Sequence, residues 1–250
     1  MSETSSLPPF VPESAPLVSA VIPCLNEEDA IAAVVAGVLA QGVDEVVVVV
    51  DGGSTDHTAE RALAAGARVV RETRRGYGQA IQTGIAALRA NTGIVVFLDG
   101  DGSDRPEMIP ALIEPIVGRR VVFVHGSRVK GEREPGSLSA QQLIAGAVAG
   151  FLLRLIYGAR FTDMSPFRAI QRDALERLGM RETTFGWNLE MLMRAAAAGL
   201  PSLEIPVGQR RRAGGVSKVS GNFVSGLKAV WSIATTFVRL ALTLRRESRE

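Results

Sequence analysis

The sequence predicts an α/β fold with a mostly parallel central sheet flanked by helices, and three observations lead to this class. Short β-branched runs alternate with helical stretches through residues 17–128, which is typical of βα units that build a parallel sheet. Glu45–Val50 is almost pure valine, as expected for a strand buried on both faces. Hydrophobic residues make up 46% of the 250 residues, enough for a sizeable core.

The alternating pattern divides the first half of the chain into strands and helices. Asn26 is a candidate N-cap for the first helix, and Pro106 suits the first turn of another. The strands are expected over Val18–Ile22, Glu45–Val50, Arg68–Arg71, Gly93–Leu98 and Val121–Val124. The helices are expected over Glu27–Ala40, Asp56–Ala65, Gln79–Ala90 and Pro106–Val117.

Beyond residue 128 the alternation ends. Residues 129–139 are polar and contain glycine and proline, so we expect a loop there, and Arg210–Gly221 reads as a basic, glycine-containing loop. Helices are expected over Ala140–Tyr157, Trp187–Ala198 and Asn222–Leu244, and strands over Phe167–Ile170 and Leu203–Val207. We expect one domain over residues 17–244, preceded by a disordered leader (1–16) and followed by a charged tail (245–250).

Composition narrows the classes of function. The net charge is +2, and the chain has one cysteine, Cys24, and two histidines, His57 and His125, which excludes a disulfide scaffold and a multi-histidine metal site. Aromatic residues amount to 5% and no nucleic-acid motif is present, so nucleic-acid binding is not expected. We find neither a signal-peptide pattern nor a run of about 18 uncharged apolar residues. We therefore expect a cytoplasmic protein without a membrane-spanning helix, and contact with the membrane surface stays open.

Acidic turns follow several of the expected strands. In open α/β sheets ligands bind at the carboxyl ends of the strands, so these turns are expected to converge. Asp99 and Asp101 flank Gly100 after a buried strand, and two such carboxylates can bind Mg²⁺ or Mn²⁺ together. An ordinary acidic turn is the alternative.

The turn Asp51–Asp56 has a similar ambiguity, because Asp51 either contacts a nucleotide or only supports the capping of the next helix. After the first expected strand the sequence reads PCLNEE, which lacks the G-x-G-x-x-G fingerprint of dinucleotide-binding proteins, and a Walker A loop is also absent.

Four segments in this order and spacing resemble family 2 glycosyltransferases of the GT-A fold. They are Pro23 with Asn26-Glu27, Asp51–Asp56, Gly76–Ala80 and Asp99-Gly100-Asp101. Three later segments resemble the branch that contains dolichyl-phosphate mannose and glucose synthases, namely Gly126–Arg128, Asp163–Arg168 and Arg210–Lys218. The resemblance covers about residues 17–235.

The resemblance implies an inverting, metal-dependent hexosyltransferase that uses a nucleotide-diphosphate sugar, with UDP-glucose favoured and GDP-mannose second. It implies that Asp99 and Asp101 bind Mg²⁺ or Mn²⁺, and that residues 17–128 bind the donor while 129–221 bind a polyprenyl phosphate or other lipid acceptor. The residues it assigns to the donor are Pro23, Asn26, Glu27, Asp51, Gly76, Gly78, Gln79, Asp99, Gly100, Arg210, Arg212, Ser217 and Lys218. Those assigned to the acceptor are Asp163, Ser165 and Arg168, and those assigned to catalysis are Asp101, Arg128 and Glu190.

Alternatives remain for the acceptor, the final helix and the class. Glu190 would be the general base if the acceptor were a hydroxyl, since a phosphate acceptor is already anionic. The amphipathic helix Asn222–Leu244 suits an anionic membrane surface, the core of the protein or a second copy in a homodimer. A nucleotidyltransferase is disfavoured by the PCLNEE segment, and a non-catalytic nucleotide- or partner-binding protein is disfavoured by the intact acid pair.

Overall fold

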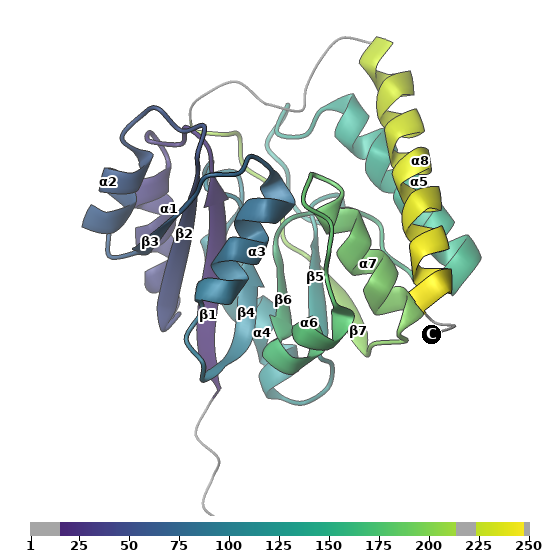
Figure 1. Ribbon diagram of the computed structural model, residues 1–250, viewed down its shortest axis with the longest axis horizontal. Coiled ribbons are helices and arrows are strands. Elements are labelled where there is room, and N and C mark those ends of the chain that lie inside the picture. Colours follow the sequence, from purple (N-terminus) through teal and green to yellow (C-terminus); the bar gives the residue numbers. More distant parts are fainter. Residues whose placement is uncertain (1–15, 214–223, 248–250) are drawn as a thin grey trace, which may run out of the picture.

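The computed structural model describes residues 16–213 and 224–247 (Figure 1). Its sheet has the strand order β3-β2-β1-β4-β6-β5-β7. Strand β6 is antiparallel to both of its neighbours, and the other pairs are parallel, so the predicted mostly parallel sheet is confirmed. The strands are β1 (Leu17–Cys24), β2 (Glu45–Asp51), β3 (Arg68–Glu72), β4 (Thr92–Phe97), β5 (Phe123–Ser127), β6 (Arg168–Gln171) and β7 (Ser202–Pro206).

Helices cover both faces of the sheet (Figure 1). One face packs on α1 (Ile31–Leu39), α2 (Thr58–Ala64) and α4 (Ile109–Val117), the last of which follows a 3₁₀ turn, η1 (Pro106–Met108). The other face packs on α3 (Tyr77–Ala87), α5 (Ala140–Tyr157), α6 (Arg172–Leu178), α7 (Trp187–Ala197) and α8 (Val224–Glu247).

The valine run of β2 explains why the core has two layers. Every residue of β2 is buried. Val46, Val48 and Val50 join the α1 layer, whereas Val47 and Val49 join the α3 layer. Alternate side chains of a strand point to opposite faces, so a strand that is apolar at every central position serves both layers. The prediction of a strand buried on both faces is confirmed.

One local prediction is wrong, and one helix was not predicted. Helix α1 begins at Ile31 rather than at Glu27, because Asn26 has a left-handed backbone (φ 52°) and its side-chain oxygen accepts the N–H of Thr55 instead of capping the helix. Helix α6 was not predicted, since seven residues directly after a strand give too short a helical pattern to detect.

Helix α5 has a composition that bears on membranes. Among the described helices it is long and apolar enough to cross a bilayer, with a mean hydropathy of 1.4 over 18 residues, of which 22% are buried. Arg154 lies within this helix, which is why the helix contains no run of about 18 uncharged apolar residues. Length and composition alone do not separate a span from a core helix.

Candidate functional site

The candidate site lies at the carboxyl edge of the sheet, where β1 and β4 are neighbours and the strand order changes direction. Asp51 ends β2, Asp99 and Asp101 follow β4, and Arg128 follows β5. This edge is the general ligand site of open α/β sheets. The convergence predicted for the acidic turns is therefore present in the fold.

The turns after β1 and β2 are clamped together. Asn26 Oδ1 accepts the N–H of Thr55 at 2.8 Å, and the Asn26 N–H donates to Ser54 Oγ at 3.2 Å. The N–H of Glu27 donates to Thr58 Oγ1 at 2.9 Å. Pro23, one residue before the end of β1, pairs in register with Val49 of β2. The clamp fixes the rim of the expected nucleotide pocket through hydrogen bonds within the chain.

Asp51 connects the β2 turn to the start of α3. Its Oδ1 accepts the N–H of Gly53 at 2.8 Å and its Oδ2 accepts that of Gly76 at 3.3 Å. Gly76 has φ 144°, and a Cβ at Gly78 would lie 2.3 Å from the carbonyl oxygen of Glu182. These glycines are needed for a close backbone approach between α3 and residues 182–184. The side chain of Gln79 is buried and donates to Glu72 Oε2 at 3.0 Å, which places it within the fold.

The acidic turn holds three carboxylates rather than two. Asp101 Oδ1 accepts the N–H of Ser103 at 2.8 Å, and Asp99 Oδ1 accepts the hydroxyl of Tyr77 at 3.1 Å. Asp104 Oδ2 accepts the N–H of Asp99 at 2.9 Å, while its buried Oδ1 has no hydrogen-bond partner. The sequence analysis did not single out Asp104. The pattern that could have identified it is an acidic residue two positions before Pro106, the first residue of η1.

Burial and mutual repulsion both disfavour the ionised forms of Asp99 and Asp104 in this turn. Burial and the charges of Asp101 and Asp104 raise the pKa of Asp99 well above its usual value. Burial, together with Asp101, also raises the pKa of Asp104 to about 7. Carboxylates that disfavour one another's ionisation gain from a bound positive charge.

Arg212 supplies such a charge from the other side of the edge. Its guanidinium lies 3.0 Å from Asp101 Oδ2 and 2.7 Å from Glu27 Oε1. The N–H of Ala213 donates to the Asp101 carbonyl at 3.1 Å, and the N–H of Arg210 donates to the Ser103 carbonyl at 2.8 Å. The described part of the basic loop is therefore docked on the acidic turn, and Ser217 and Lys218 lie outside the described residues.

The residues present fit a divalent cation. Asp99 and Asp101 offer hard oxygen ligands, and Mg²⁺ commonly uses one or two carboxylates while phosphates and water complete its shell. Within residues 16–213 and 224–247 no group of three or more acidic, histidine or cysteine side chains is arranged to hold a metal by itself. A donor diphosphate would therefore have to contribute ligands, and Arg212 would have to leave Asp101.

A buried ion pair follows β5. The guanidinium of Arg128 donates two hydrogen bonds of 2.7 and 2.8 Å to Asp163, and the backbone N–H of Arg128 donates to the same carboxylate at 3.0 Å. Burial opposes ionisation of Asp163, but Arg128 outweighs it and lowers the pKa of that carboxyl to about 2. Behind the pair, His125 Nε2 is 2.9 Å from the Asp163 carbonyl oxygen, and burial lowers the pKa of His125 to about 3. The imidazole is neutral, so Nε2–H donates this bond.

Arg168 is fully buried among backbone carbonyls. Its guanidinium donates to Pro166 at 3.3 Å, to Asn188 at 3.2 Å and to Ser165. Burial lowers its pKa to about 10. Ser165 is also buried, and its Oγ accepts the N–H of Phe167 at 3.1 Å. Through these contacts, Arg168 and Ser165 stabilise the backbone conformation of residues 165–168.

Glu190 is committed to the fold. Its carboxylate accepts the N–H of Arg181 at 3.1 Å and that of Glu182 at 2.8 Å, and it binds Arg194 Nε at 2.8 Å. Only 1% of the residue is exposed. The contacts of Glu190 anchor residues 181–182, the segment on which Gly78 packs, and do not favour the role of general base expected for a hydroxyl acceptor.

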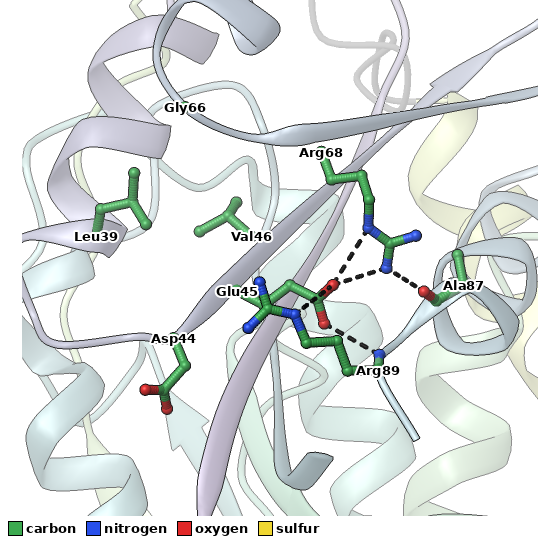
Figure 2. Close-up of a pocket in the computed structure, with 8 residues that line it drawn as sticks. All are labelled: Leu39, Asp44, Glu45, Val46, Gly66, Arg68, Ala87 and Arg89. Carbon is green, nitrogen blue, oxygen red and sulfur yellow. Dashed lines mark hydrogen bonds and ion pairs between the residues drawn. The ribbon is translucent and has the colours of Figure 1, made fainter. Parts of the chain in front are cut away.

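A pocket of about 370 Å³ lies away from the candidate site, at the opposite end of the sheet and at the start of β2 (Figure 2). Glu45 is at its centre, with Arg68 Nη2 at 2.7 Å and Arg89 Nε at 3.6 Å (Figure 2). The hydroxyl of Ser19 and the N–H of Arg89 also donate to this carboxylate. The charges of this pocket satisfy one another, so it is a structural network rather than a second site.

Comparison with known proteins identifies the family of the chain. A 37% identical relative over 214 residues is an uncharacterized glycosyltransferase of Mycobacterium tuberculosis, covering 85% of this chain and 94% of the relative. A dolichyl-phosphate hexose transferase of Haloferax volcanii is 34% identical over 194 residues, covering 76% and 81%. The fold is similar to that of glucosyl-3-phosphoglycerate synthase from Mycobacterium tuberculosis, with a TM-score of 0.69, 24% identity and coverage of 91% and 80%. The sequence profile of Glycosyl transferase family 2 matches residues 19–179. The chain is therefore a GT-A-fold enzyme that belongs to glycosyltransferase family 2.

Proposed function

We propose that this enzyme transfers a hexose, with inversion, from a nucleotide-diphosphate sugar to a polyprenyl phosphate or another lipid acceptor. The observation that carries the proposal is the convergence of Asp51, Asp99 and Asp101 with Arg128 and Arg212 at one sheet edge. Carboxylates there suit a cation and a nucleotide, and arginines suit phosphate oxygens. UDP-glucose is the favoured donor and GDP-mannose the second.

On the donor side, Asn26, Glu27 and Asp51 would line the nucleotide pocket. Asp99 and Asp101 would hold Mg²⁺ or Mn²⁺, which when bound takes up negative charge on the leaving diphosphate. Arg212, released from Asp101 as the donor enters, is within reach of the same diphosphate and would add a second positive charge. Binding of the donor would thus exchange one cation for another at Asp101.

On the acceptor side, an acceptor oxygen attacks the anomeric carbon from the face opposite the diphosphate. The bond from that carbon to the diphosphate oxygen breaks, and the nucleoside diphosphate leaves with the electron pair. A phosphate acceptor brings an anionic oxygen, so no proton has to be removed. This agrees with Glu190, whose carboxylate is engaged by Arg194 and by backbone N–H groups.

The proposal is tested by nucleotide release from a panel of UDP- and GDP-sugars with Mg²⁺ or Mn²⁺, with and without a short-chain polyprenyl phosphate. We expect release that depends on the lipid phosphate and on the metal. Asp101→Asn should abolish it, whereas Glu60→Gln, an exposed change on α2, should not alter it.

Release that is unchanged by the lipid would contradict the lipid-phosphate acceptor. The same panel would then be repeated with hydroxyl acceptors. If no sugar nucleotide is turned over or bound with metal, the donor proposal is wrong as well.

A further inference from the structure

Helix α5 has its large and small apolar residues on the wrong faces for a helix of a water-soluble protein. Its buried side consists of Ala145, Gly146, Ala149 and Leu153. Its outer side presents Ile144, Phe151, Leu155 and Ile156, which are 46%, 65%, 69% and 47% exposed. A surface helix normally turns its large apolar residues to the core and polar residues to water. Here four large apolar residues face outward, and Leu153 is the one large side chain among the fully buried residues of α5.

Helix α8, which packs on α5, also carries exposed apolar residues. It packs beside α5 (Figure 1), with Tyr157 of α5 and Phe237 of α8 in ring contact at 6.4 Å. Phe237 is buried, whereas Val238 and Leu242 on α8 are 57% and 52% exposed. We call the exposed apolar residues of both helices the α5–α8 face, namely Ile144, Phe151, Leu155, Ile156, Val238 and Leu242. Exposed large apolar residues on two helices that pack together indicate an interaction site.

The charged side chains of α5 and of residues 233–246 of α8 are all arginines. Arg154, Arg245 and Arg246 are exposed, and Arg239, which is also exposed, pairs with Glu182. Neither α5 nor residues 233–246 of α8 contain an aspartate or glutamate. Large apolar residues flanked by arginines are the composition of a surface that binds anionic lipid headgroups.

A second copy of the chain is a poorer occupant on the same grounds. In a two-fold dimer a patch meets itself, so the arginines of one copy would face those of the other. Neither α5 nor residues 233–246 of α8 provide a carboxylate to offset this repulsion, and like charges across an interface are unfavourable.

We propose that the α5–α8 face docks on the anionic surface of a lipid bilayer, with α5 lying in the plane of the interface. Helix α5 does not cross the bilayer in this arrangement, because its inner side is packed on the protein. A Cβ at Gly150 would lie 2.4 Å from the Phe161 carbonyl oxygen, so helix and protein are in direct backbone contact there. Arg154 would reach the headgroups from the same plane.

The docked helix adjoins the acceptor side of the candidate site. A Cβ at Gly146 would lie 3.5 Å from Asp163 Oδ1, and Asp163 holds Arg128. The inner side of α5 therefore contacts the ion pair, while its outer side contacts the bilayer. The inference rests on the proposed function only where it connects docking to a lipid acceptor, because the surface itself is argued from α5 and α8 alone.

The test is co-sedimentation of the full-length protein with vesicles, without donor or acceptor. The vesicles consist of phosphatidylcholine alone or of phosphatidylcholine with phosphatidylglycerol. We expect binding to the anionic vesicles that weakens with added salt. Phe151→Ser with Leu155→Ser should weaken it about tenfold or more, and Arg154→Glu, an exposed change that leaves the packing intact, should weaken it severalfold. The matched control is Leu63→Ser on α2, which removes a 65% exposed leucine outside the face and should have no effect.

Three results would overturn the inference. One is no binding of the wild type to anionic vesicles. Another is equal loss of binding in the Leu63→Ser control. The third is a dimer in sedimentation velocity that the Phe151→Ser/Leu155→Ser variant dissociates, since a second copy would then cover the face. Metal-dependent binding of UDP- and GDP-sugars, measured without vesicles, tests the proposed function separately, so the two failures are distinguishable.

Discussion

Arg212 and Asp101 form an ion pair of 3.0 Å that joins the basic loop to the acidic turn. The pair places a protein cation on a carboxylate that is expected to bind a metal ion. A metal ion bound as proposed would compete with Arg212 for Asp101, and this competition can be measured.

Arg212→Gln should raise the affinity for Mn²⁺ in the absence of nucleotide. The Arg212 side chain is 28% exposed, and a pair with partial solvent access is worth about 0.5–1 kcal/mol, or about two- to fivefold in affinity. The measurement is free Mn²⁺ by electron paramagnetic resonance. Arg211→Gln is the control, because Arg211 contacts Glu134 and the Pro135 carbonyl instead. Unchanged Mn²⁺ affinity in Arg212→Gln would mean that the two cations do not share Asp101.

Asp163→Asn should lower the free energy of unfolding by about 3–5 kcal/mol, because it leaves the buried guanidinium of Arg128 without a counter-charge. Urea unfolding at neutral pH measures this. Glu114→Gln breaks an exposed pair with Arg120 and should cost no more than about 1 kcal/mol. Similar losses in the two variants would contradict a structural role for the buried pair.

The neutral, buried His125 predicts a stability that falls in mild acid. Its pKa is lowered from 6.5 to about 3 in the folded protein, so between these values the unfolded chain binds a proton that the folded protein does not. Neutral His125 therefore makes its full contribution to the free energy of unfolding above pH 6.5. This contribution is lost as pH falls below 6.5, by about 1.4 kcal/mol per pH unit. Urea unfolding at pH 7.5 and 5.5 should show this loss in the wild type and a smaller one in His125→Gln. Equal slopes in the two proteins would assign the loss to other groups.

Glu190→Gln separates a structural role from a catalytic one. An amide cannot replace both oxygens that Arg194, Arg181 and Glu182 use, so we expect a loss of about 2–3 kcal/mol in unfolding free energy. We expect kcat to change by less than about tenfold, since the proposed phosphate acceptor would need no base. A loss of about a thousandfold in kcat with normal stability would instead identify Glu190 as the base.

The sequence was informative where one local pattern decides the structure. The valines of β2 predict a strand buried on both faces, and the position of Asp99 after a buried strand predicts its place at the carboxyl edge. Asn26 was misread because Thr55, its partner, is 29 residues away. An asparagine that caps the next helix and one that binds a residue far along the chain can stand in the same local sequence, so the sequence around Asn26 does not distinguish the two.

The site shows the same limit. The resemblance placed Arg212 near phosphates, but its contact with Glu27 spans 185 residues and is set by the packing of the loop on the edge. Glu190 has the position of a base along the chain, and only the fold reveals that Arg194 and two backbone N–H groups occupy its carboxylate. The inverted faces of α5 are also invisible in the sequence, since apolar residues occur on all sides of the helix.

Because Gly100 packs on Cys24, the reactivity of the chain's single thiol can be used to follow opening of the acidic turn. A Cβ at Gly100 would lie 2.3 Å from Cys24 Sγ, so the thiol is enclosed directly beneath the acidic turn, and Cys24 is 3% exposed. A thiol reagent can reach it only when this edge of the sheet opens. The rate of alkylation therefore records how often the turn lifts, without any label being introduced, and slower alkylation on adding metal and nucleotide would time the closing of the site.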